Sequence, residues 1–203
     1  MTSIRLATLV VGGTGQPWLA LGFALDQHGR IPVNNGALEF TGSGSGLLAL
    51  SVAGLDTSVG LDGIVVAAGA ARSAWPAIDH PNGAFELDHV VVMTDSLERT
   101  SDAVAVVLGC ERRRTRDTGD QRQAFHRLGP GGVILEIVER EGVTGVGLFG
   151  VVFTVVDLDA VVAAHDRDVL GLATDATQPG RRIASVRSGA GLGVPTAFMS
   201  PNL

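Results

Sequence analysis

The feature that most constrains the fold of this chain is a pattern that recurs along it. Residues 151–159 read Val-Val-Phe-Thr-Val-Val-Asp-Leu-Asp, a β-branched run that ends in an acidic turn. Residues 48–56 and 90–98 match this segment without gaps, and residues 4–12 fit it less closely. Four such starts predict up to four related units, and because units of this size cannot bury a sheet face alone, we expect them to pair around shared cores.

The clearest unit lies between residues 85 and 150. Its patterns predict a strand, a helix and three further strands, at residues 87–93, 95–108, 111–116, 123–128 and 133–139. A similar order returns after residue 150, with a strand at 151–156, a helix from 157 to about 167, and strands at 181–187 and 194–199. We therefore expect an α+β fold of paired βαβββ modules that form cupped mixed sheets, with the C-terminal pair complete.

The N-terminal part is shorter than the C-terminal part, so its second helix is expected to be missing or reduced. Proline, glycine and polar residues interrupt the pattern at residues 77–83. The predicted domains are residues 1–82, a shortened half, and residues 83–203.

Composition excludes several kinds of chemistry. The chain has no tyrosine, and all fifteen of its basic residues are arginines, which excludes a Schiff-base lysine, a Walker lysine and a catalytic tyrosine. A net charge of −6 without a basic tract disfavours nucleic acid as a partner. No apolar run approaches the roughly 20 residues of a membrane span, and the lone Cys110 suits a reducing compartment. We expect a cytoplasmic protein that binds no membrane.

Residues 10–15, Val-Val-Gly-Gly-Thr-Gly, are a poor dinucleotide fingerprint, because the third glycine is missing and Pro17 follows. No nucleotide cofactor is expected. The arginine-rich run at residues 112–116 places charge on both faces of its strand, which indicates an edge protected against aggregation.

The strand and helix order, opened by residues 87–92 and closed by residues 133–138, resembles a module of the vicinal oxygen chelate superfamily, the glyoxalase-like proteins. Residues 147–199 resemble its partner. The resemblance implies a cup around one divalent ion (zinc, nickel, manganese or iron) whose ligands come from the first and last strands of each module. His89 and Glu136 stand at these places in the first module, whereas Gly150 and Ala197 stand there in the second. Because neither Gly150 nor Ala197 can bind metal, the predicted ligand set is incomplete.

A hydrogen-bonded pair of His89 and Glu136 without metal is the alternative. Burial would then raise the pKa of Glu136, which could act as a general base beside His89. Both residues are therefore the predicted catalytic residues.

Four further residues are candidates for substrate binding. Gln123 and His126 lie on one predicted strand but on opposite faces, so only one of them can face the cup. Arg181 and Arg182 enter a strand together, and the one that points inward would bind a carboxylate or another anion; two solvated arginines are the alternative. The remaining histidines, His28, His80 and His165, lie in or near polar turns and are expected to be solvated.

The leading functional hypothesis is a glyoxalase-like protein that binds a small oxygen-rich or anionic metabolite. If it is an enzyme, an isomerase or lyase that removes a proton next to a carbonyl is favoured. The incomplete metal set favours the alternative, a non-catalytic sequestration or sensor protein. A dioxygenase is a weaker alternative, since His126 would have to supply a second imidazole. The resemblance also implies a possible homodimer.

Overall fold

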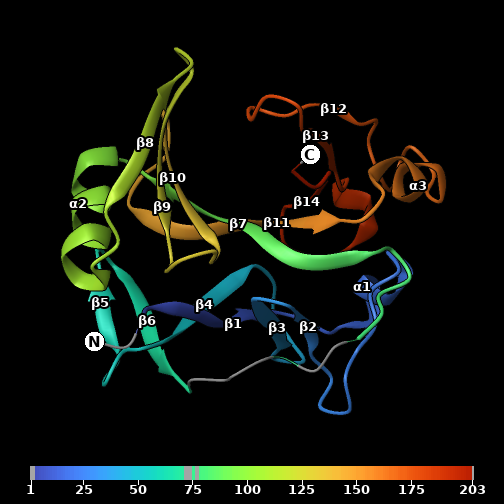
Figure 1. Ribbon diagram of the computed structural model, residues 1–203, viewed down its shortest axis with the longest axis horizontal. Coiled ribbons are helices and arrows are strands. Elements are labelled where there is room, and N and C mark those ends of the chain that lie inside the picture. Colours follow the sequence, from blue (N-terminus) through green and yellow to red (C-terminus); the bar gives the residue numbers. More distant parts are fainter. Residues whose placement is uncertain (1–2, 71–74, 76–77, 203) are drawn as a thin grey trace.

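The computed structural model describes residues 3–70, 75 and 78–202. It consists of two curled mixed β-sheets, one stacked on the other, with few and short helices (Figure 1). The predicted α+β class and the cupped sheets are confirmed.

The six-stranded sheet is built from the N-terminal part of the chain. Its elements are β1 (Arg5–Val11), α1 (Gln16–Ala20), β2 (Ile31–Val33), β3 (Gly36–Phe40), β4 (Leu47–Ala53), β5 (Val59–Leu61) and β6 (Ile64–Gly69). The strand order is β2-β3-β1-β4-β6-β5.

The eight-stranded sheet is built from the C-terminal part. Its elements are β7 (Ala84–Thr94), α2 (Leu97–Leu108), β8 (Arg112–Asp117), β9 (Gln121–Arg127), β10 (Ile134–Arg140), β11 (Val146–Val155), α3 (Leu158–Ala163), β12 (Thr174–Asp175), β13 (Arg182–Ser185), the 3-10 helix η1 (Ser188–Ala190) and β14 (Thr196–Met199). The strand order is β12-β13-β14-β11-β7-β10-β9-β8. We call residues 84–140 the first module and residues 146–199 the second module.

The two sheets share one topology. In the larger sheet, β7 pairs in parallel with β10 and antiparallel with β11, which pairs in parallel with β14. In the smaller sheet, β1 relates to β3, β4 and β6 in the same way. The five-residue α1 stands where the larger sheet has the twelve-residue α2, and a turn joins β4 to β5 where the larger sheet has α3. The predicted shortened N-terminal pair is therefore confirmed.

Local signals fix both helices of the larger sheet. Ser96 precedes α2 in an extended conformation, and Gly109 ends the helix in the left-handed region at φ 63°, where glycine has no steric penalty. Asp157 caps α3, because its Oδ1 accepts the backbone N–H of Ala160 at 2.9 Å. Helix α3 ends at Ala163, earlier than the predicted residue 167.

A single apolar core lies between the two sheets. Leu87, Val90 and Val92 of β7 are buried on the face that meets the six-stranded sheet. Trp18 and Phe23 reach this core from below, and Phe23 lies 4.8 Å from the ring of Phe153. The predicted domain division between residues 82 and 83 falls in the connection between β6 and β7. The apolar core contains residues from both sides of this division. Residue 77 of the predicted boundary lies outside the described residues.

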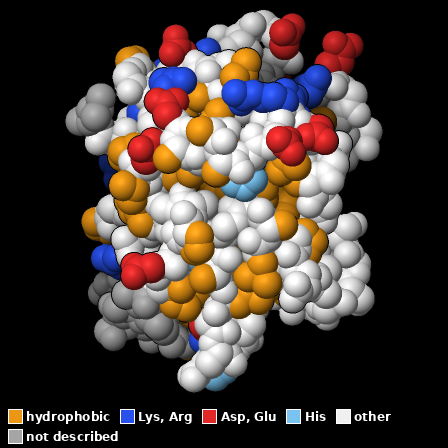
Figure 2. Space-filling view, turned by 90° about the vertical axis from the view of Figure 1, so that its right-hand side faces the viewer, with side chains coloured by type: hydrophobic (Ala, Val, Ile, Leu, Met, Phe, Trp, Pro, Cys, Tyr) orange, Lys and Arg blue, Asp and Glu red, His pale blue; other side chains and the backbone are white. Residues whose placement is uncertain are grey.

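Because the smaller sheet covers one face of the larger sheet, the opposite face is left concave and open. We call this concave face the cup; it opens at the top of Figure 1, between β8 and the β12–β13 connection. On the side face of the molecule, charged side chains gather toward the same end, and apolar side chains are exposed below them (Figure 2). Among the described residues, no helix is long and apolar enough to cross a membrane.

Candidate functional site

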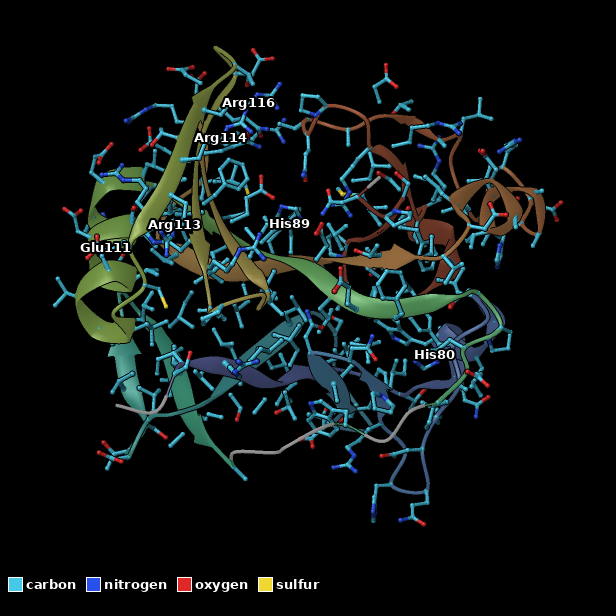
Figure 3. All side chains as sticks on the ribbon, in the orientation of Figure 1. His80, His89, Glu111, Arg113, Arg114 and Arg116 are labelled. Carbon is cyan, nitrogen blue, oxygen red and sulfur yellow. The ribbon has the colours of Figure 1, made fainter. Side chains whose placement is uncertain are left out.

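The cup contains a pocket of about 410 Å³. Both modules line it, and the lining residues are His89, Arg114, Phe125, Arg127, Ile134, Glu136, Val152, Asp175, Ala176, Thr177, Gln178, Ile183 and Met199. His89 lies at the base of the cup, where β7 and β11 run side by side (Figure 3). Both predicted catalytic residues, His89 and Glu136, therefore line the same pocket.

A β-bulge positions His89. His89 pairs with Val152 and Leu87 pairs with Phe153, so Asp88 is an extra residue in β7. The bulge allows Asp88 to reach its own neighbour: Oδ2 of Asp88 lies 3.3 Å from Nδ1 of His89, close enough for an ion pair although not aligned as a hydrogen bond. With Nδ1 buried beside this carboxylate, Nε2 is the ring nitrogen left to meet a ligand.

Arg181 holds Asp88 in place. Its Nη1 donates to both carboxylate oxygens of Asp88, at 2.7 and 3.0 Å, while Nε donates to the carbonyl of Ser200 and Nη2 to the hydroxyl of Thr154. Burial by itself would raise the pKa of Asp88, but His89 and Arg181 together lower that pKa below its ordinary value of 3.8. Asp88 is therefore a largely buried carboxylate held in its ionised form.

Glu136 behaves in the opposite way. It lies on β10 with only part of its surface exposed, and burial raises the pKa of its carboxyl above the ordinary 4.5, although His89 and Arg116 oppose the shift. Nε2 of Gln123 donates to Oε1 of Glu136 at 2.9 Å. Glu136 is thus poised to take up a proton, as a general base must.

The second module presents only apolar side chains at the corresponding places. Val152 pairs with His89 across the centre of the sheet, and Met199 occupies the register position on β14 that Glu136 occupies on β10. With Ile183, they form an apolar wall that faces His89 and Glu136.

The predicted positions Gly150 and Ala197 are therefore two residues too early. The two modules were aligned in sequence by the starts of their helices, Leu97 and Leu158. The segment from the pocket residue to the helix start is two residues shorter in the second module, from Val152 to Leu158, than in the first, from His89 to Leu97, and this difference displaced the alignment at the pocket. A side chain at position 150 would in addition meet the carbonyl of Pro195 at 2.7 Å.

The donor set does not fit the divalent ion that the resemblance implies. Within residues 3–70, 75 and 78–202, no three histidine, cysteine or acidic side chains come together in a group able to hold a metal. His89 and Glu136 supply two candidate ligands, whereas Val152 and Met199 supply neither the nitrogen nor the oxygen that such ions prefer.

Strand β9 resolves the choice between its two predicted site residues. Gln123 shares the cup face with Phe125 and Arg127, whereas His126 points to the other side, beneath α2. Nε2 of His126 lies 2.8 Å from the hydroxyl of Ser101, and Nδ1 donates to the carbonyl of Cys110 at 2.7 Å. His126 therefore lies outside the pocket, where it cannot serve as the second imidazole of a dioxygenase site.

Neither predicted anion-binding arginine lines the pocket. Arg181 points inward but is committed to Asp88, and Arg182 points outward to Asp159, with its Nη1 at 2.7 Å from Oδ1. The arginines that do line the pocket are Arg114 and Arg127, which we did not predict from the sequence.

The expectation of three solvated histidines is wrong for His80. This ring is buried: its Nδ1 accepts the backbone N–H of Ala24 at 3.0 Å, and its Nε2 donates to the carbonyl of Pro32 at 2.8 Å. Burial lowers its pKa below 6.5. His28 is exposed and His165 is partly exposed.

Comparison with known proteins supports the fold. No protein-family model and no curated protein matches the sequence. Among solved structures, the methylmalonyl-CoA epimerase of Mycobacterium tuberculosis is similar with a TM-score of 0.52 and 16% identity, over 60% of this chain and 91% of the epimerase. A variant of the Streptomyces coelicolor methylmalonyl-CoA epimerase, in complex with 2-nitronate-propionyl-CoA, is similar with a TM-score of 0.50 and 20% identity, over 59% and 99%. These epimerases belong to the vicinal oxygen chelate superfamily, so the predicted resemblance is confirmed at the level of the fold.

Proposed function

We propose that the cup binds a small organic ligand with a carbonyl group, and that Glu136 removes a proton from the carbon next to that carbonyl in an isomerase-type reaction. The observation that carries the proposal is a glutamate with a raised pKa inside a pocket. The similar structures are named as epimerases, which agrees with this reaction class.

The surroundings of Glu136 suit a base that is protonated and deprotonated in turn. Gln123 donates to the carboxylate through Nε2, and its Oε1 is buried without a hydrogen-bond partner among the described residues. After rotation of its amide, Gln123 can accept the proton of a neutral Glu136 through Oε1, because an amide offers both a donor and an acceptor. Both protonation states of the base therefore have a partner.

His89 is placed to meet the carbonyl oxygen. As proton removal transfers negative charge to that oxygen, the imidazolium form of His89, with one proton on Nδ1 toward Asp88 and one on Nε2, would donate from Nε2 and stabilise the enolate that forms. Asp88, fixed by Arg181, positions the ring from the Nδ1 side. Return of the proton from Glu136 to the same face of the ligand carbon would regenerate the starting compound, so net isomerisation requires its return to the other face or to the neighbouring carbon. No other reactant is consumed.

Exchange of carbon-bound protons tests this proposal without knowledge of the natural substrate. A panel of small ketones, oxo acids and acyl thioesters is incubated with the protein in D₂O and followed by NMR. We expect exchange in at least one compound, and Glu136→Gln should slow it by roughly 100- to 10,000-fold. Glu141→Gln, an exposed change in the turn after β10, is the matched control. Exchange that Glu136→Gln leaves unchanged would exclude Glu136 as the base.

A second candidate is a binding protein without catalysis. The apolar wall of Val152, Ile183 and Met199 favours it, because this wall can hold a ligand but offers no reacting group. Ligand binding without proton exchange in any compound of the panel would support this candidate and exclude the first.

A further inference from the structure

Three arginines face the cup from the first module, above the catalytic residues. Arg114 pairs in register with Phe125, and Arg116 pairs with Gln123, so each lies beside a residue of the cup face. Arg127 follows on β9 and also lines the pocket. Figure 3 shows Arg114 and Arg116 on the upper part of β8, toward the open end of the cup, with His89 at its base. We call Arg114, Arg116 and Arg127 the cup arginines.

Among the described residues, none of the cup arginines forms an ion pair with a carboxylate, although Arg116 and Arg127 lie near enough to oppose the rise that burial causes in the pKa of Glu136 and of Glu86. Nη1 of Arg116 donates to the hydroxyl of Thr177 at 2.6 Å, across the mouth of the cup, and Nη1 of Arg127 donates to the carbonyl of Gly132 at 2.9 Å. Within the described part of the chain, Arg114 has no hydrogen bond or ion pair.

Two other arginines of the first module, Arg112 and Arg122, are neutralised by ion pairs. Arg112 pairs with Glu98 on the helix side of the same strand, and Arg122 pairs with Glu98 and Glu139. In a chain with a net charge of −6, arginines without acidic partners that gather at one cavity indicate a local excess of positive charge.

Two carboxyl groups line the same pocket and do not cancel this charge. Glu136 is hydrogen-bonded by Nε2 of Gln123, and even with both carboxyl groups ionised the three cup arginines exceed them in charge. Asp175 lies in the opposite wall on the short strand β12, is exposed, and forms no ion pair with the described residues. The cup therefore retains an uncompensated cationic side.

We infer that the ligand of the cup carries an anionic group, a carboxylate or a phosphate, which Arg114 binds at the mouth together with Arg116 and Arg127. A guanidinium offers several N–H donors in one plane and matches either anion. The apolar part of the ligand lies on the wall of Val152, Ile183 and Met199. The anionic group takes no part in the proposed proton transfer. The inference rests on the proposed function only where it places the ligand's carbonyl group at Glu136.

Matched pairs of probes test the inference. The carboxylate arm uses phenylpyruvate and benzoate, each beside its neutral methyl ester, and the phosphate arm uses phenyl phosphate beside phenol. Thermal unfolding finds which probes bind, and calorimetry measures their affinity. We expect at least one anion to bind at least about tenfold more tightly than its neutral partner, because a charge-assisted hydrogen bond to a guanidinium is stronger than a neutral one. The arm that responds identifies the anion.

Two neighbouring residues provide the variant and its control. Arg114→Gln should weaken anion binding about tenfold. Arg113→Gln removes the same charge from an exposed position that does not line the pocket, and should leave binding unchanged. Equal binding of anions and neutral partners, equal losses in both variants, or no stabilisation by any anion would each overturn the inference.

The outcomes separate this inference from the proposed function. Anion binding that depends on Arg114, with no proton exchange in any compound, would support the inference and reject Glu136 as a base. Exchange that depends on Glu136 in neutral carbonyl compounds, with no effect of Arg114→Gln on any anion, would support the base and reject the anion site.

Discussion

The two modules that form the cup share a topology but differ in chemistry. The first contributes His89, Glu136 and the cup arginines, whereas the second contributes Val152 and Met199 at the register positions that correspond to His89 and Glu136. The backbone symmetry of a paired fold thus does not extend to its side chains. A ligand with one polar and one apolar side suits such a pocket, and a metal that needs ligands from both modules does not.

The ion pair of Asp88 and Arg181 joins the two modules, so its loss should have the largest effect on stability. Arg181→Met leaves the carboxylate of Asp88 buried without its partner and should lower the free energy of unfolding by about 3–5 kcal/mol in urea denaturation. Arg182→Met, which removes an exposed pair with Asp159, should cost less than about 1 kcal/mol. Equal losses in the two variants would mean that Arg181 does not hold the modules together.

Substitution of the second module's pocket residues should remove the difference between the modules. Val152→His combined with Met199→Glu would add an imidazole and a carboxylate opposite His89 and Glu136, and we expect the double variant to bind zinc. At a zinc concentration about 100 times the dissociation constant, binding should add about 2.7 kcal/mol to the free energy of unfolding.

The control for this design is the same double variant with His89→Ala, which should bind zinc more weakly in calorimetry. The wild-type protein should show no stoichiometric zinc by elemental analysis. Stoichiometric zinc in the wild type, lost in both His89→Ala and Glu136→Ala, would contradict the difference between the modules.

Two buried histidines, one in each half of the chain, should make stability depend on pH. Burial lowers the pKa of His80 and of His126 below 6.5, so the unfolded chain binds protons more readily than the folded protein. Stability is therefore full above pH 6.5 and falls as the pH decreases, by at most about 1.4 kcal/mol per pH unit for each histidine. Urea denaturation between pH 7 and 5 measures the slope. His126→Gln should flatten it, while His28→Gln, at an exposed position, should leave it unchanged.

Glu136 should have a smaller effect of the opposite sign. Its pKa in the folded protein is raised above 4.5, so the stability that it contributes below pH 4.5 is lost as the pH rises through the folded pKa. Glu136→Gln removes this loss and should make the protein more stable by about 1 kcal/mol at pH 7. The gain in stability of Glu136→Gln over the wild type should disappear below pH 4.5. The control Glu141→Gln should show no gain in stability either at pH 7 or below pH 4.5. A variant less stable than the wild type at pH 7 would show that the glutamate is held by favourable contacts instead.

Local patterns were sufficient to predict most elements of the larger sheet, although not the short β12 or the helix η1, and to place the side chains of one pocket strand. Alternation along a strand depends on the backbone alone, which is why the sequence could place Gln123 and His126 on opposite faces of one strand. Helix α2 ends at Leu108 as predicted, because the left-handed Gly109 that follows it is a local requirement. His89 and Glu136 were assigned to one site through the family resemblance, which implies ligands on the first and last strands of a module, and β7 and β10 do pair side by side.

Features that depend on pairing between distant strands could not be predicted. The bulge at Asp88 exists only through the register of β7 against β11, so neither its contact with His89 nor its pair with Arg181 has a local signal. The same register shifts the second module's pocket positions to Val152 and Met199. Arg114 belongs to a run that indicates edge protection, and only its pairing with Phe125 places it at the cup.

Strand β7 packs on both of its faces, and this arrangement determines how readily the residues of the pocket can be substituted. One face of this strand carries Leu87, Val90 and Val92 into the core shared with the N-terminal sheet, and the other face carries His89 into the cup. Residues that keep the protein folded and residues that meet the ligand thus occupy separate faces of one strand. The pocket face can therefore tolerate exchange of polar for apolar residues without loss of the core. The shortened N-terminal half, whose described helix α1 has five residues, supplies the other side of that core, and so leaves the pocket face of the larger sheet free to change.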